Sequence, residues 1–257
     1  MPGAYAHLKF GEEVLPLLPA ALSERIRSED ALFRLGLIGP DFLFFYCPTL
    51  PNIVTALGRK IHSDAGLRFF SFGASVLRRK GFPPDEFAYL CGVLCHFVLD
   101  SGCHGFISSV TGRFNVGHIE LENAFDRSLM LRDGKNPDQC PLGAFRITRA
   151  QSEVMSVFYR GLSPKKLRRA VSSSAFYGTM LSGVRGFVGK TLCGKLLPDE
   201  RKRRVRVLEK GEAGLSKRFR LLLGTAARLI SELEQNARKK APWDEAYSYS
   251  FAGKKVL

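Results

Sequence analysis

The chain has 257 residues, of which 45% are hydrophobic, so it can form a packed core and is not a disordered chain. Its six cysteines are too dispersed for a disulfide scaffold and predict free thiols. The net charge of +15 is uneven, because residues 1–150 carry +1 and residues 151–257 carry +14. A basic region attracts phospholipid headgroups or nucleic acid, although it can also be a solvated helix face.

The first residues give no sign of export. They lack the basic segment followed by an apolar segment that marks a signal peptide. We also find no uninterrupted apolar run of the roughly 18 residues that span a bilayer. With free thiols, these features predict a cytoplasmic protein, and the basic region adds peripheral contact with a membrane.

Apolar residues recur at helical spacing along the first half of the chain. Residues 20–39 predict one helix that ends near its last two glycines. Residues 63–106 predict two helices separated by the sequence GFPPDE, in which the prolines break the first helix. Asp85 and Glu86 follow those prolines and suit the positive end of the second helix.

The second half of the chain continues the helical pattern. Helices are predicted over residues 118–134, over residues 163–187 after a Ser-Pro start signal, and over residues 217–240. Residues 113–121 alternate as a strand would, but the polar spacing that follows them favours a helix. The sequence therefore predicts an all-α, multi-helix bundle.

The chain is expected to divide near residues 135–145, where the helical pattern is interrupted. We predict a helical core over residues 1–135 and a basic helical extension over residues 136–257, packed on the same bundle. Within the extension, residues 201–220 concentrate Lys and Arg, and residues 220–233 add an apolar face. Such a helix either lies on an anionic membrane or closes the bundle with its apolar face.

The segment CGVLCHFVLDSGCHGF, residues 91–106, places ionisable side chains in an apolar helix. Residues four apart lie on one helix face, so His96 and Asp100 point the same way. His104 joins them if the helix runs past Gly102. A charged stripe of this kind is costly to bury unless something occupies it.

A second pair repeats the spacing, because His118 and Glu122 are four residues apart and Asp126 lies one turn further. The chain has five histidines, and none follows residue 118. A lone histidine in an apolar helix usually has a structural role, but two His-carboxylate pairs favour a metal site between adjacent helices. Imidazole and carboxylate are zinc ligands, and a carboxylate can bridge two ions.

At these positions the chain resembles the bacterial zinc-dependent phospholipase C family, which is distantly related to a group of zinc nucleases. The elements that carry the resemblance are AHLKFGEEVL, LGLIGPDFLFFY, GRKIHSD, LCHFVLDSGCHGF and GHIELENAFDRSLM. They cover roughly residues 1–135, and the order of their ligand-type residues is that of the family's trinuclear zinc site. The resemblance implies a metal cluster built between the helices of residues 1–135.

The resemblance implies metal ligands at His7, Asp41, His62, His96, Asp100, His104, His118 and Glu122. Asp41, His62, His96 and Asp100 would surround one zinc, with Asp41 as a ligand or the general base. His104, His118 and Glu122 would hold a second zinc. Asp100 would bridge the first zinc to a third, bound by His7 and by the N-terminus.

The third zinc position departs from the family pattern. The secreted relatives use an N-terminal tryptophan, whereas this chain begins Met1-Pro2 and its one tryptophan is Trp243. If the initiator methionine is removed, the amine of Pro2 could take that role. The resemblance thus implies two or three zinc ions.

The activity implied is hydrolysis of a phospholipid to a diacylglycerol and a phosphorylated headgroup. Two alternatives stay open: a zinc-dependent nuclease or phosphodiesterase acting on nucleic acid, and a non-catalytic, metal-stabilised helical protein that docks on membranes. The basic extension suits both anionic substrates, and the aromatic residues after Asp41 could stack bases, receive acyl chains or lie in the core. We favour the phospholipid over nucleic acid as the substrate.

Overall fold

The computed structural model describes residues 3–143, 145–195, 198–239 and 241–257, with side chains described except at residues 181–195, 198 and 239. Among these residues there is no strand, and two isolated bridges, Ala65–Ser250 and Tyr249–Lys255, are the only β-type pairing. The expected all-α bundle is therefore confirmed. The α-helices are α1 Ala4–Val14, α2 Ala20–Arg27, α3 Asp30–Leu37, α4 Ile53–Ser63, α5 Gly66–Lys80, α6 Pro84–Phe114, α7 His118–Arg132, α8 Arg149–Ser156, α9 Pro164–Lys195 and α10 Pro198–Lys239. Three 3₁₀-helices, η1 Leu15–Leu17, η2 Gly39–Phe45 and η3 Glu245–Ser248, complete the set.

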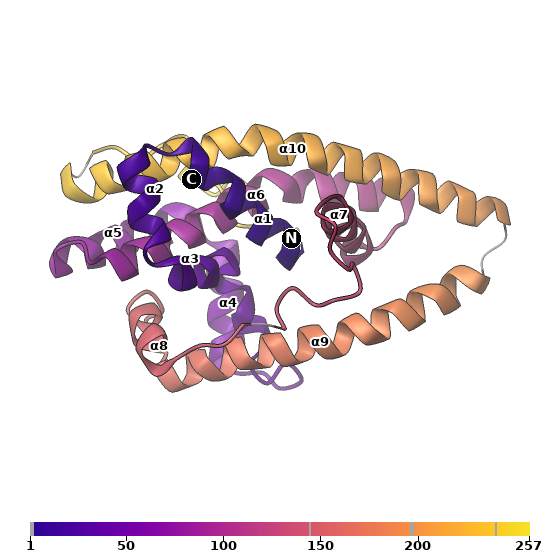
Figure 1. Ribbon diagram of the computed structural model, residues 1–257, viewed down its shortest axis with the longest axis horizontal. Helices are drawn as coiled ribbons and strands as arrows, with labels where there is room; N and C mark the ends of the chain where they lie inside the picture. Colours follow the sequence, from indigo (N-terminus) through magenta and orange to yellow (C-terminus); the bar gives the residue numbers. More distant parts are fainter. Residues whose placement is uncertain (1–2, 144, 196–197, 240) are drawn as a thin grey trace.

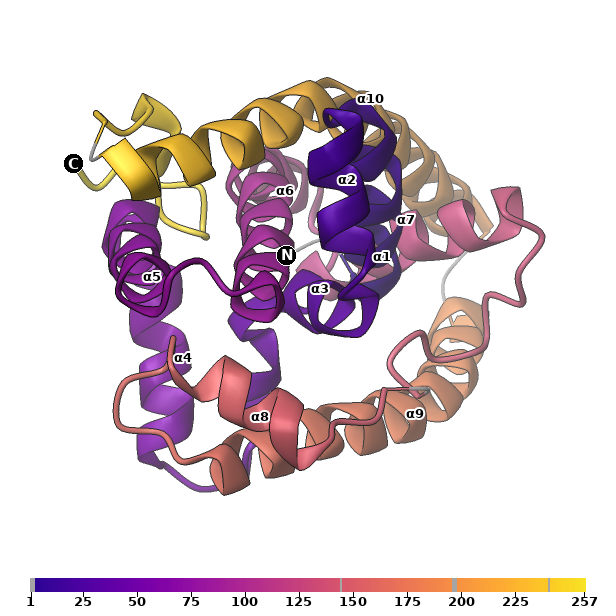
Figure 2. The ribbon, with the colours of Figure 1, turned by 60° about the vertical axis from the view of Figure 1, so that its left-hand side comes forward.

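Helix α6 is the axis of the fold. Helices α1, α3, α5, α7 and α10 contact it, and Figure 2 shows α6 near the middle of the molecule with these helices around it. Pro84 at its first position and Asp85 and Glu86 in its first turn are the expected start signals. It has 31 residues, about 46 Å at 1.5 Å per residue, and it runs through Gly102 without a break. The continuous helix needed to align His96 with His104 is therefore present.

Helix α6 is also long and apolar enough to cross a membrane by length and composition, with a mean hydropathy of 1.4 in its most apolar window. The sequence has no uninterrupted apolar run of that length, because His96 and Asp100 interrupt it. The mean hydropathy of a whole window stays high in spite of these two residues. In the fold, 72% of that window is buried inside the protein. This burial is typical of a core helix that is covered by neighbouring helices.

The helix expected over residues 20–39 is instead two helices, α2 and α3, separated at Ser28 and Glu29. The Ser28 hydroxyl donates to the carbonyl of Arg25 at 2.8 Å, which competes with continued helix hydrogen bonding. The break lets α3 cross α6 at the point where Gly36 of α3 lies against Gly92 of α6. A Cβ on Gly36 would lie 2.3 Å from the carbonyl oxygen of Tyr89, so this close approach requires glycine.

The other expected helices are present, and α10 is longer than its amphipathic part predicted, since it begins at Pro198 rather than near residue 217. Its apolar face closes the bundle, because Ala226, Leu229, Ile230 and Leu233 are fully buried. Leu221 of the same stretch is 67% exposed, so contact of this helix with a membrane stays a prediction. Figure 1 shows α9 and α10 as two long helices along opposite borders of the molecule.

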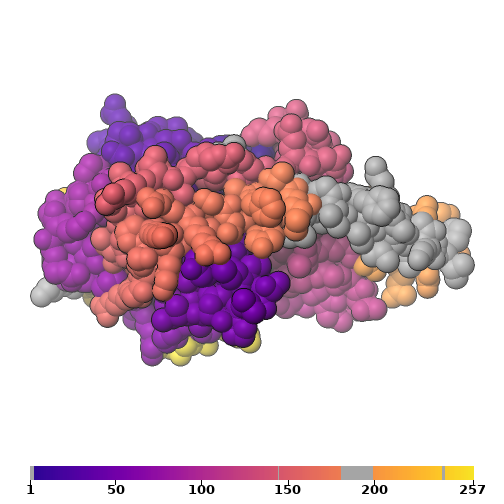
Figure 3. Space-filling view, turned by 90° about the horizontal axis from the view of Figure 1, so that it is seen from below, coloured from indigo at the N-terminus to yellow at the C-terminus, as the bar shows by residue number. Residues whose placement is uncertain are grey.

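Two segments bring residues from outside α6 to its charged face. The first segment consists of η2 and α4. The described part of α9 packs against η2, and Figure 3 shows these elements on one face of the molecule. The other is the chain after α10, which folds back so that the carbonyl of Tyr249 accepts a hydrogen bond from Gly66 N at 2.8 Å. Phe251 is thereby fully buried. The division of the chain near residues 135–145 stays a prediction.

Candidate metal centre

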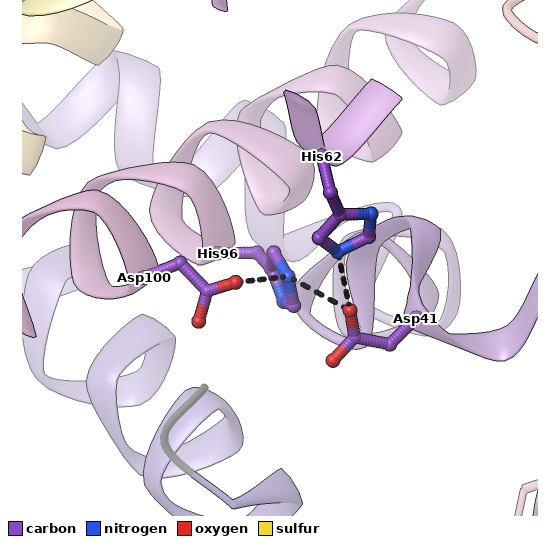
Figure 4. Close-up of side chains that lie close together, drawn as sticks. All are labelled: Asp41, His62, His96 and Asp100. Carbon is purple, nitrogen blue, oxygen red and sulfur yellow. Dashed lines mark hydrogen bonds and ion pairs between the residues drawn. The ribbon is translucent and has the colours of Figure 1, made fainter. Parts of the chain in front are cut away.

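Four ionisable side chains converge from three elements on one point, as Figure 4 shows. Asp41 lies in η2, His62 in α4, and His96 and Asp100 in α6, and their candidate ligand atoms lie within 4.8 Å of one another. Asp41 Oδ1 is 2.8 Å from His62 Nε2 and 3.6 Å from His96 Nε2. His96 Nε2 is also 3.3 Å from Asp100 Oδ2, so the predicted alignment of this pair on one helix face is confirmed.

Backbone carbonyls orient the two imidazoles of this group. His62 Nδ1 lies 2.7 Å from the carbonyl oxygen of Gly58, and His96 Nδ1 lies 3.1 Å from that of Leu37. A carbonyl only accepts, so Nδ1 is the donor and Nε2 of a neutral ring carries no proton. Each unprotonated Nε2 then faces a carboxylate oxygen, an arrangement that a second proton or a cation between the two atoms would satisfy.

Asp100 lies at the centre of the site and is fully buried. Its Oδ1 is 3.2 Å from His7 Nε2, while its Oδ2 faces His96, and the rings of His7 and His96 stack with centroids 4.0 Å apart. Neither Asp100 oxygen has a hydrogen-bond partner among the described residues. A carboxylate whose two oxygens face two different imidazoles has the geometry expected of a bridging ligand.

Several nitrogens share this lack of partners. His7 Nδ1 and Nε2, His96 Nε2 and His104 Nδ1 are buried without a hydrogen bond to any described residue. Each such group costs roughly 1–3 kcal/mol, and a buried carboxylate costs more, unless a partner is supplied. A group of divalent cations bound by nitrogen and oxygen would supply that partner, so the residues fit zinc.

A second group continues the site along α6 to α7. His118 Nε2 is 2.9 Å from Glu122 Oε1, and the ring centroids of His104 and His118 are 5.2 Å apart. The His118 side chain is 36% exposed, whereas those of His96 and Asp100 are 1% and 0% exposed. The centre is therefore sealed at Asp100 and reaches solvent at His118.

The pKa values of Asp41, Asp100 and His96 are set mainly by their charged neighbours, against the effect of burial. Burial alone would raise the pKa values of Asp41 and Asp100, but the neighbouring imidazoles, His96 above all, hold both pKa values well below their usual range. Burial alone would lower the pKa of His96, but Asp100 and Asp41 raise it to about 10.

The other two buried imidazoles behave in the opposite way. Burial and the charge of His96 lower the pKa of His7, and burial lowers the pKa of His104 to about 4. His7 and His104 are thus neutral at pH 7, which is the form in which imidazole binds a metal.

Sequence reasoning missed two residues that shape the first group. Gly39 precedes Asp41 with φ +57°, and a Cβ there would lie 2.5 Å from Cδ2 of His96, so both the backbone and the close approach require glycine. Phe251 packs with its ring centroid 5.4 Å from that of His62 and 6.0 Å from that of His96. Gly39 stands directly before Pro40 and Asp41 in the sequence, a pattern that could have indicated a turn at the site. Nothing in the sequence linked residue 251 to the histidines.

Asp126 has a role other than extending the His118–Glu122 stripe. Its carboxylate accepts hydrogen bonds from Tyr5 N and Ala6 N, each at 3.0 Å, at the positive end of α1. This contact anchors α1 and so places His7 beside Asp100. The residue proposed to complete the third zinc position, Pro2, lies outside the described residues.

The structure thus brings the eight sequence-predicted residues into three adjoining groups, two of which share Asp100; their role as metal ligands stays a prediction. A family model described as zinc dependent phospholipase C matches residues 6–169, which is more than half of the chain. The chain belongs to the zinc-dependent phospholipase C family. The match extends past residue 135, where the recognisable motifs end. No curated protein and no solved structure matches the chain.

Proposed function

We propose that this protein hydrolyses the phosphodiester bond of a phospholipid, releasing a diacylglycerol and a phosphorylated headgroup. The observation that carries the proposal is Asp100, a fully buried carboxylate between two imidazoles, with neither oxygen satisfied by a described donor. In a chain of this family, such a group is best explained as part of a catalytic metal cluster.

The chain offers ligands for two or three zinc ions. Asp41, His62, His96 and Asp100 would hold one, and His104, His118 and Glu122 would hold another, with Asp100 and His7 reaching toward a third. When bound, zinc supplies Lewis-acid stabilisation of phosphoryl oxygens and lowers the pKa of water toward about 7.

The residues themselves supply orientation, shielding from water and a site for a proton. The carbonyls of Gly58 and Leu37 hold the His62 and His96 rings, and Asp100 is sealed from solvent. The Asp41 side chain is 17% exposed, so it is the carboxylate of the first group that a substrate can reach. We propose Asp41 as a ligand or as the general base that receives the proton of the attacking water.

We further propose a cytoplasmic protein that contacts anionic membranes through its basic C-terminal part. The support is the net charge of +14 over residues 151–257. Most of the apolar face of residues 220–233 is buried in the bundle and Leu221 is exposed, so the contact would depend on cations and on the apolar surface that stays exposed.

The test combines metal analysis with a substrate screen. Protein purified without chelator should contain two or three zinc ions per chain, and less than one would remove the basis of the proposal. The screen compares choline, ethanolamine and inositol phospholipids with single-stranded DNA and RNA. Hydrolysis of a phospholipid supports the proposal, hydrolysis of nucleic acid alone favours the nuclease, and zinc without hydrolysis favours a non-catalytic role.

A further inference from the structure

A groove of about 630 Å³ lies between the C-terminal half of α6 and the N-terminal half of α10. That volume falls within the range of small-ligand sites, about 300–1,000 Å³. The groove is lined from α6 by Phe106, Ser109, Val110, Arg113 and Phe114, and from α10 by Asp199, Lys202, Arg203, Arg206, Val207, Lys210 and Gly211.

The groove is separate from the metal centre, although both use α6. Arg113 follows His104 by nine residues, which is about two and a half helical turns, so the two side chains point to opposite sides of the helix. Ser109 and Phe106 lie within about 40° of that opposite direction. A molecule in the groove therefore does not contact the cluster around Asp100.

The charge of the groove is strongly positive. Arg113, Lys202, Arg203, Arg206 and Lys210 line it, with Asp199 as the one lining carboxylate. None of these five cations forms an ion pair with a residue that the structure describes. Five cations gathered in one concave surface repel one another, and an anionic group placed among them removes that repulsion.

Nearby arginines show what the groove cations lack. Arg204 pairs with Glu120 of α7, and Arg132 pairs with Glu212 at 2.6 Å. These two arginines at the contact between α7 and α10 are paired with carboxylates, whereas the five groove cations form no ion pair with a described residue. The groove cations are arranged for an anion from outside the chain.

The floor of the groove is apolar. Val110 of α6 and Val207 of α10 are half-buried in it, and the ring of Phe106 is held from the side by Arg218, whose guanidinium carbon lies 4.2 Å from the ring centroid. Phe114 remains 39% exposed at the end of α6. An anion bound here would place its neighbouring carbon atoms against aliphatic and aromatic surface.

We propose that this groove binds an anionic phospholipid of a bilayer, with the headgroup phosphate among the cations and the first part of an acyl chain against Val110 and Val207. An anionic lipid matches both features at once, because it joins a phosphate to an aliphatic chain. Nucleic acid would use the cations, but it would leave the two valines without a matching partner. The inference specifies where the proposed membrane contact of the basic C-terminal part occurs and rests on that proposal. The binding requires no hydrolysis, so it fails independently of the proposed phospholipid hydrolysis.

The experiment is vesicle co-sedimentation of the full chain, with phosphatidylcholine vesicles and with the same vesicles containing phosphatidylglycerol. The groove variant is Arg206→Glu with Lys210→Glu. The control is Lys217→Glu with Arg220→Glu, which lies on exposed positions of the same helix outside the groove and changes the net charge equally. Far-UV circular dichroism, melting temperature and zinc content establish that each variant is folded.

The wild-type protein should bind the phosphatidylglycerol vesicles, and the groove variant should bind at least ~10-fold more weakly, since two cations that attract the anionic surface are replaced by carboxylates that it repels. The control variant should keep most of the binding. Equal weakening in both variants would mean that overall charge alone drives binding and would overturn the site. Absence of wild-type binding to anionic vesicles, or binding to single-stranded DNA in its place, would also overturn it.

A competition arm tests the apolar part of the proposal. Dioctanoyl phosphatidylglycerol, which is soluble, should displace the protein from vesicles, whereas inorganic phosphate at the same concentration should not. Displacement by inorganic phosphate to the same extent would make the groove a simple anion site and overturn the lipid assignment. Val207→Asp should weaken dioctanoyl phosphatidylglycerol binding without changing the melting temperature by more than a few degrees, because Val207 is only half-buried.

Discussion

The two sides of α6 carry charge in opposite ways. On the side that holds His96 and Asp100, the ionisable groups are buried and face one another across short distances. On the side that holds Arg113, the cations are exposed and face an open groove shared with α10. Helix α6 therefore has a buried face that combines both signs of charge, and on its other side it borders a groove in which cations, mostly from α10, predominate.

The difference shows how much burial changes what a charge implies. An exposed cation is hydrated, so the groove is stable without a ligand and its occupant contributes modest binding energy. A buried carboxylate has lost its hydration and requires a compensating cation, so the inner face implies a bound ion as part of the native structure. Substitutions on the inner face should therefore have much larger effects than those on the outer face.

The largest effect should come from Asp100→Asn. The change keeps the side-chain shape but removes the negative charge that lies between two imidazoles and that would bridge two ions, so phosphodiesterase activity should fall at least ~100-fold. Initial rates on the phospholipid identified by the screen, with zinc content measured in parallel, check this. His104→Ala is the comparison, and a variant Asp100→Asn that keeps most of its activity while His104→Ala loses it would disprove the bridging role.

Removing metal should be the next largest effect, because the clustered carboxylates and neutral histidines would lose their compensating ions. A ligand present at about 1,000 times its Kd adds about 4 kcal/mol, which corresponds to roughly 10 °C in Tm for a chain of this size. Thermal unfolding with and without EDTA measures the shift. An unchanged Tm in zinc-free protein would contradict a cluster that belongs to the native fold.

Gly39→Ala should destabilise the protein by about 2 kcal/mol or more. The left-handed backbone at φ +57° disfavours alanine by roughly 1–2 kcal/mol, and the added Cβ must displace the His96 ring. Urea unfolding measures the loss, and the zinc content should fall with it. The matched control is Gly105→Ala in α6, where a Cβ meets nothing within 4 Å, so stability should rise by about 0.5–1 kcal/mol.

The smallest effect on stability should come from the outer face. Arg206→Glu with Lys210→Glu removes no ion pair with a described residue, so the free energy of unfolding should change by less than about 1 kcal/mol. Zinc content should be unchanged, because these side chains lie across α6 from the histidines. Loss of zinc in this variant would show that the two faces of α6 are coupled and do not respond separately.

Much of the fold was predictable because helical periodicity is local. The i, i+4 spacing alone aligned His96 with Asp100, and the prolines of GFPPDE marked the break between α5 and α6. The split between α2 and α3 was not predictable, because a Ser28 hydroxyl and a glycine contact with α6 decide it. The apolar face of α10 was ambiguous for a similar reason, since periodicity shows that a face is apolar but not what covers it.

The amino-acid pattern was enough to predict the all-α class, the start of α6 and the residue types of a metal site, because backbone hydrogen bonding sets which side chains share a helix face. Three contacts required the folded chain: Asp41 and His62 reach the face of α6, Asp126 anchors α1, and Phe251 packs against the histidines. These contacts join residues far apart in the chain. They depend on how whole helices pack, which is set by the shapes of many side chains together and not by the spacing within any one of them.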